Sequence, residues 1–308
     1  MTYAAEVHAS VEELEERLPH FTGLGEHQRQ DSGFVNVIPD QDARVLKVPG
    51  GWAICMREDT KGVPAEEVNK AANEKVAAIQ EATGRKVGKK ELREIKADVI
   101  HDLLPRAFAR QKLTYVLYSE RTQRLFVNTG SQKAADLVMT HLVECLKSLK
   151  TSTVHVSEPK MGLTARLHNW LADKDEDDCF GTMEPSTEVV MKGNDRKWAI
   201  KAESLRSVAD TLREAINGHA SVDSIGFAMD NGVTFRITAA LRVKGVKHRV
   251  VDNSDDLEIH HSWVSQLASE IATLDDIMDV MLDLLSPEKA QVSATEPTQE
   301  DDELANLF

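Results

Sequence analysis

The spacing of apolar side chains predicts several amphipathic helices. Residues 65–82 and 89–104 are rich in Ala, Glu and Lys, and their apolar positions recur at helical spacing. Gly84 lies between these two segments, so we expect a helical hairpin or bent arm. Another helix is expected at residues 131–149, and a long acidic helix at residues 260–285.

Strands are expected on either side of short polar turns, of which Asp230-Asn231-Gly232 is the strongest hairpin signal. The expected strand pairs are residues 43–48 with 52–57, residues 113–118 with 124–128, and residues 221–229 with 233–243. The order of hairpin followed by helix occurs twice along the chain. It predicts an α+β fold of antiparallel sheets with covering helices.

These elements divide the chain into four parts. They are a central α+β region (residues 1–63 and 113–160), a helical arm (residues 64–112), a second α+β region (residues 161–285) and an acidic tail (residues 286–308). Pro, Glu, Ser, Thr, Gln and Asp dominate the tail without periodicity, so we expect it to be disordered.

The composition favours a globular intracellular protein. Hydrophobic residues make up 41% of the 308 positions, and no apolar run reaches the ~18–20 residues that a membrane span needs. The first residues are acidic and polar, so no secretory signal is expected. Three widely spaced cysteines do not form a disulfide framework. We therefore expect a cytoplasmic protein with no membrane partner.

Charge is segregated along the chain. The formal net charge is −14, but residues 251–308 hold 15 Asp and Glu against one Lys and account for all of it. Residues 85–112 hold nine Lys and Arg and four acids. A segment of this kind can bind a polyanion although the chain as a whole is acidic.

The cations of the arm are the candidate DNA contacts. They are Arg85, Lys86, Lys89, Lys90, Arg93, Lys96 and Arg106. Spacings of three, four and seven residues put most of those between Lys86 and Lys96 toward one side of a helix. Such a stripe fits the phosphates of DNA. The alternative is an ordinary solvated face, since Lys90 and Glu94 have the spacing of an i,i+4 ion pair.

The sequence contains no recognisable catalytic site, metal site or cofactor motif. It lacks the GxxxxGK[ST] and GxGxxG loops of nucleotide-binding proteins and the HExxH and CxxC patterns of metal sites. A metal-dependent nuclease needs clustered carboxylates, for which residues 175–178 and the Glu288-Lys289 pair are the best candidates. Both have the composition of solvated surface, so we expect no enzyme, with a nuclease as the alternative.

A short motif at the end of the arm resembles a known family. Residues 103–108 read Leu-Leu-Pro-Arg-Ala-Phe after a Lys/Arg-rich helix, as in the bacterial recombination-associated protein family RdgC. Residues 51–58 resemble an early strand of that family, and residues 163–170 resemble its Leu-Thr-x-x-x-x-x-Trp segment.

The resemblance implies a nucleoid-associated protein of the bacterial cytoplasm that binds DNA without sequence preference and restrains recombinase loading. It implies a horseshoe-shaped subunit, two of which close into a ring-shaped homodimer around double-stranded DNA. Phe108 takes the place of the phenylalanine that helps to close the ring, and Arg85 that of a DNA-contacting arginine. Two departures are expected: Glu203 stands near the place of a functional glutamine, and residues 1–10 show no hydrophobic strand.

The acidic tail ends in an apolar tip formed by Leu304, Leu307 and Phe308. This tip loosely resembles the C-terminal peptide of bacterial single-strand-binding proteins and the peptides that bind sliding clamps. A recombinase or replication protein is therefore a candidate partner, and a protein–protein adaptor is a third candidate function. Alternatively, the tail solubilises the protein, or it mimics DNA and occupies the DNA channel.

Overall fold

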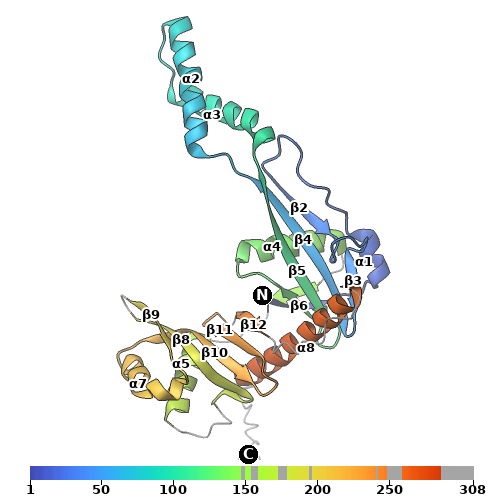
Figure 1. Cartoon of the computed structure of the whole chain (residues 1–308), viewed down its shortest axis with the longest axis vertical. Coiled ribbons are helices and arrows are strands. Elements are labelled where there is room, and N and C mark those ends of the chain that lie inside the picture. The colour runs from blue at the N-terminus through green and yellow to red at the C-terminus, as the bar shows by residue number, and fades with distance from the viewer. Residues whose placement is uncertain are drawn as a thin grey trace, which may run out of the picture. The chain divides into compact units, whose positions relative to one another are not determined.

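The computed structural model describes residues 1–146, 150–153, 159–172, 179–193, 196–240, 242–247 and 259–285. The chain divides into two compact units, each built on an antiparallel sheet (Figure 1). Unit 1 comprises Met1–Ser152 with Asp256–Ala272, and unit 2 comprises Thr153–Asp255 with Thr273–Phe308. The predicted α+β class with antiparallel sheets is confirmed.

Unit 1 is built on a seven-stranded sheet in the order β2-β4-β5-β6-β1-β7, with β3 paired to the first part of β4. The strands are β1 (Thr2–Glu6), β2 (Gln30–Val35), β3 (Val45–Val48), β4 (Gly51–Lys61), β5 (Ala109–Ser119), β6 (Arg124–Val127) and β7 (Lys150–Thr153). The helices are α1 (Val11–Arg17), α2 (Ala65–Thr83), α3 (Lys89–Leu103), the 3-10 turn η1 (Leu104–Arg106), α4 (Gln132–Leu146) and the first part of α8 (Ile259–Leu285). Helices α2 and α3 form the arm, which connects β4 to β5 (Figure 1).

Different elements cover the two faces of this sheet. Side chains alternate along a strand, so Ile54 and Met56 lie on one face, where they join the core that includes residues of α1 and α4. Tyr115 lies opposite Cys55 on the other face. There its ring centroid is 6.0 Å from that of Trp263 in α8.

Unit 2 is built on a five-stranded sheet in the order β12-β11-β10-β8-β9. Its strands are β8 (Met183–Lys192), β9 (Lys197–Lys201), β10 (Ser221–Met229), β11 (Thr234–Thr238) and β12 (Val243–Lys247). Its other elements are α5 (Pro159–Leu171), η2 (Leu205–Val208), α7 (Ala209–Asn217) and the second part of α8. Val189, Phe227 and Phe235 are buried on the face that packs against α5 and α7, and Thr164 of α5 accepts a hydrogen bond from the Val222 amide.

Several predicted elements differ from the observed ones. The expectation that residues 1–10 hold no strand is wrong, because Tyr3 and Ala5 of β1 are buried and β1 pairs with β6. The single strand expected at residues 233–243 is two strands, since reciprocal bonds between Thr238 and Arg242 close a turn between β11 and β12. No helix in the described ranges is long and apolar enough to cross a membrane.

Candidate nucleic-acid interface

The helical arm is held together by a small apolar core. Val68 and Ala72 of α2 pack with Ile95 and Val99 of α3, and all four side chains are buried. Gly84 ends α2 with a φ of 64°, a left-handed conformation that favours glycine. Because the apolar sides of the two helices face each other, the charged residues lie on the outside of the arm.

Four of the predicted DNA contacts are exposed cations near the start of α3. Lys89, Lys90 and Arg93 are exposed in the first part of α3, where Lys89 and Arg93 are about one turn apart. Lys86 is exposed as well, but α3 begins only at Lys89. Lys86 therefore lies in the loop between the helices. The prediction from residue spacing, which placed Lys86 on the same side of a helix as Lys89 and Arg93, is wrong for Lys86.

Two of the predicted DNA contacts already have polar partners in the arm. Arg85 pairs with Glu91 through Nη1–Oε2 and Nη2–Oε1 distances of 2.7 and 2.6 Å. This pair raises the pKa of the Arg85 guanidinium and lowers the pKa of the Glu91 carboxyl. Lys96 Nζ donates to Asn69 Oδ1 of α2 at 2.8 Å. A DNA phosphate must compete with these partners for both cations.

Contacts at the base of the arm connect α3 to the loop before β2. The rings of His27 and His101 are stacked, with centroids 4.1 Å apart, and His27 Nδ1 lies 3.2 Å from the His101 carbonyl oxygen. Lys61 holds the same loop, because its ammonium group donates to the carbonyl oxygens of Gly25 and Glu26. The arm with its exposed cations is therefore held at its base by contacts with the loop before β2.

Phe108 is the most exposed large apolar side chain in the described part of the chain, at 94%. It follows η1 and precedes β5, between the exposed Arg106 and Arg110. A phenyl ring that is left in water contributes almost nothing to the folding of its own subunit. It is suited instead to contact with another protein surface or with nucleic-acid bases.

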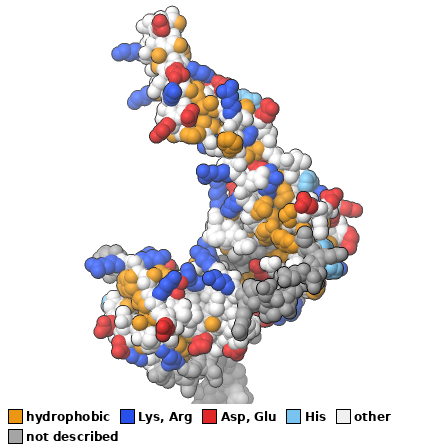
Figure 2. Space-filling view, in the orientation of Figure 1, with side chains coloured by type: hydrophobic (Ala, Val, Ile, Leu, Met, Phe, Trp, Pro, Cys, Tyr) orange, Lys and Arg blue, Asp and Glu red, His pale blue; other side chains and the backbone are white. Residues whose placement is uncertain are grey.

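A second basic surface lies on the sheet of unit 2, and the sequence pattern did not reveal it. Figure 2 shows Lys and Arg side chains along the part of this unit that carries β9, β11 and β12. The cations of these strands and of β8 are Lys192, Lys197, Lys201, Arg236, Lys244 and Lys247. The available signal was a short apolar run with a charged residue at each end, at 188–192 and again at 197–201.

The remaining residues with possible site chemistry are Cys55, Glu203 and the acidic clusters. Burial raises the pKa of the Cys55 thiol to about 11, so this cysteine is protonated near pH 7. Glu203 is exposed just before η2. Within the described ranges, no three His, Cys, Asp or Glu side chains are grouped so that they could hold a metal ion. Outside the described residues lie the acidic run at 175–178, the Glu288-Lys289 pair, and the tip residues Leu304, Leu307 and Phe308.

Comparison with known proteins identifies the family. Residues 1–286 match the family described as "Putative exonuclease, RdgC". The chain is 33% identical over 154 residues to the recombination-associated protein RdgC of Halorhodospira halophila, and this match spans 50% of each chain. It is 26% identical to the protein of that name from Colwellia psychrerythraea over 81% of each chain. For the Neisseria meningitidis protein the identity is 27%, over 63% of this chain and 64% of the relative. The resemblance seen in the motif at residues 103–108 is therefore confirmed, and the chain belongs to the RdgC family of recombination-associated proteins.

Proposed function

We propose that this protein binds double-stranded DNA without sequence preference and that the arm supplies part of the contact. The observation that carries the proposal is the group of exposed cations at Lys86, Lys89, Lys90 and Arg93. Lys and Arg contacts to phosphates position a protein on DNA without reading its bases. The arm offers such contacts from a helix whose apolar side is already occupied by α2.

Fluorescence anisotropy with two unrelated 40-bp duplexes over a range of salt concentrations tests the proposal. If four cations of the arm each neutralise one phosphate, log K falls with log salt by about 3.6 per arm. Arg93→Ala is expected to weaken binding to both sequences alike and to reduce this slope by about 1. Binding that is insensitive to salt, or that strongly favours one duplex, would refute the proposal.

The proposal includes a ring-shaped homodimer of horseshoe-shaped subunits that encircles the duplex. Two features support it: the likeness to the RdgC family and the exposed ring of Phe108. In a ring, cations can line the hole while the acidic residues stay outside, so the net charge of −14 does not oppose DNA binding.

Closed-circular DNA tests encirclement, and strand exchange tests the effect on recombination. A ring bound to a closed circle should resist a salt wash and leave when the DNA is cut; release at equal rates from circles and linear DNA would refute encirclement. A protein of this type should also slow strand exchange catalysed by a bacterial recombinase. Unchanged strand exchange at concentrations that saturate the DNA would refute that role.

A nuclease is the second candidate, because the matching family is described as an exonuclease. The best candidates for its metal-binding carboxylates are the acidic run at residues 175–178 and Glu288. Incubation with Mg²⁺ and an end-labelled linear duplex measures the activity directly. Release of nucleotides by the wild type, lost in Asp175→Ala, would establish the nuclease, and an intact duplex would dismiss it.

A further inference from the structure

A row of charged side chains crosses the sheet of unit 2. Lys244 of β12 lies opposite Arg236 of β11, and Arg236 lies opposite Gly226 of β10. On the other side of Gly226 comes Glu188 of β8, which lies opposite Lys201 of β9. Directly opposed residues of antiparallel strands point to the same face. The row therefore reads cation, cation, gap, anion, cation across all five strands.

Gly226 provides the gap that lets the row form an ion-pair network. A Cβ atom at this position would lie 2.8 Å from Ser186 Oγ and 3.3 Å from the Glu188 carbonyl oxygen. The Arg236 side chain reaches across the gap, and its Nη2 lies 2.7 Å from Glu188 Oε2. From the other side, Lys201 Nζ lies 4.0 Å from the same oxygen. One carboxylate thus engages two of the three cations in the row.

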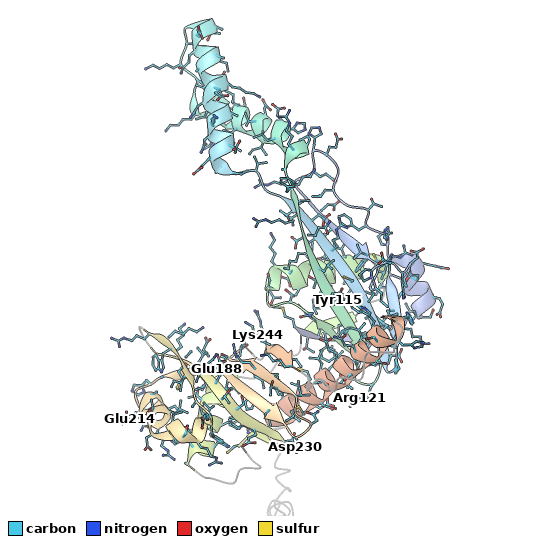
Figure 3. The ribbon with its side chains drawn as sticks, viewed as in Figure 1. Tyr115, Arg121, Glu188, Glu214, Asp230 and Lys244 are labelled. Carbon is cyan, nitrogen blue, oxygen red and sulfur yellow. The ribbon has the colours of Figure 1, made fainter. Side chains whose placement is uncertain are left out.

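The face that carries this row, which we call the open face, is exposed to solvent. It is opposite to the face where Val189 and Phe227 are buried, and Figure 3 shows Glu188 and Lys244 extending from the same side of the sheet. The exposed cations on strands of this sheet are Lys192, Lys197, Lys201, Lys244 and Lys247. Five strands about 4.8 Å apart make a surface roughly 19 Å wide, enough to meet several phosphates.

We propose that the open face is a second phosphate-binding surface and that Glu188 is its internal competitor. In the absence of DNA the Glu188 carboxylate holds Arg236 and Lys201, and a DNA phosphate replaces it when the duplex binds. The exchange is chemically matched, because carboxylates and phosphates accept charge-assisted hydrogen bonds from guanidinium groups in the same way. A built-in competitor weakens the contact and keeps it exchangeable.

The inference rests on the proposed DNA binding and extends it to unit 2. Glu188→Gln keeps the shape of the side chain and removes its charge. The variant is expected to bind a 40-bp duplex about two- to five-fold more tightly, because the ion pairs of Glu188 with Arg236 and Lys201 no longer have to be broken. Its salt slope is expected to be steeper by about 1, since Arg236 then joins the phosphate contacts.

Glu214→Gln is the matched control. Glu214 is exposed on α7, which packs on the covered side of the sheet (Figure 3), and the substitution changes the net charge by the same amount. It is expected to leave affinity and salt slope unchanged. Equal effects of Glu188→Gln and Glu214→Gln would overturn the inference, because total charge alone would then explain both.

A second variant tests the surface without touching the ion pair. Lys244→Ala is expected to weaken binding and to make the salt slope shallower by about 1, whereas Lys133→Ala on α4 serves as the exposed-lysine control. If Arg93→Ala weakens binding while Glu188→Gln and Lys244→Ala behave as wild type, the inference fails and the proposed function stands. If the wild type does not bind the duplex at any salt concentration, the proposed function itself fails.

Discussion

Phe108→Ala separates the contribution of this side chain to assembly from its contribution to folding. The ring is 94% exposed in the subunit, so its removal takes away almost no buried surface. The free energy of unfolding of the isolated subunit should therefore change by less than about 0.5 kcal/mol. In the proposed dimer, by contrast, the ring is buried between subunits, and the substitution is expected to weaken the dimer.

The size of this effect follows from the exposed ring and the symmetry of a dimer. Full burial of a phenylalanine side chain contributes about 1.5–3 kcal/mol. A two-fold axis repeats each contact, so the substitution removes two rings per dimer and about 3–6 kcal/mol in total. At about 1.4 kcal/mol per factor of ten, the dissociation constant of the dimer should rise roughly 10²- to 10⁴-fold.

Sedimentation velocity over a dilution series measures this constant, and thermal unfolding of the same samples reports on the fold. Val143→Ala is the control, because Val143 is an apolar side chain of α4 that is 44% exposed, and it should leave the dimer unchanged. If Phe108→Ala sediments like the wild type down to the lowest concentration, the reasoning about Phe108 is wrong. A marked loss of subunit stability would instead show that the ring packs within its own chain.

Three further predictions concern the arm, the sheet of unit 1 and the tail. Ile95→Ala opens the buried contact between α2 and α3 and should destabilise the arm by about 2–4 kcal/mol; hydrogen exchange should speed up in residues 65–103 but not in the sheet. Burial raises the pKa of the Cys55 thiol from 9.0 to about 11. Between pH 9 and pH 11 the thiol is therefore deprotonated in the unfolded chain but still protonated in the folded chain, and the free energy of unfolding falls as the pH rises. In urea unfolding with reductant present, Cys55→Ala should reduce this dependence of the free energy of unfolding on pH. An unchanged pH dependence would show that Cys55 is not its cause. Deletion of residues 286–308 removes six acids and one lysine and should tighten DNA binding at low salt; unchanged affinity would exclude competition between the tail and DNA.

Elements with a strong internal pattern were predicted close to their observed bounds. Helices α2 and α3 each carry their own helical periodicity, and Gly84 marks the break between them. Strands β1 and β2 were not predicted, because short segments with small or polar residues have little pattern of their own. Each becomes a strand through pairing with a distant partner, β1 with β6 and β2 with β4, and such pairing cannot be read from a local window.

The same distinction applies to the candidate site. The basic character of the arm is visible in the sequence, but the pairing of Arg85 with Glu91 and of Lys96 with Asn69 depends on how the loop and the two helices meet. The row of charged residues on the open face is even harder to recognise from the sequence. Its charged members come from four strands, and Glu188 and Arg236 are 48 positions apart in the chain.

The sequence by itself determined the α+β class, the two helices of the arm, the segregation of charge and the family motif at residues 103–108, because each depends on neighbouring residues. Only the tertiary structure decided that Phe108 is left in water, that Arg85 is held by a carboxylate, and that Glu188 stands between Lys201 and Arg236. Exposure and ion pairing depend on where the folded chain places each side chain, and Glu188 and Arg236 come from positions 48 residues apart. They follow from packing and strand register, which no local pattern of residues specifies.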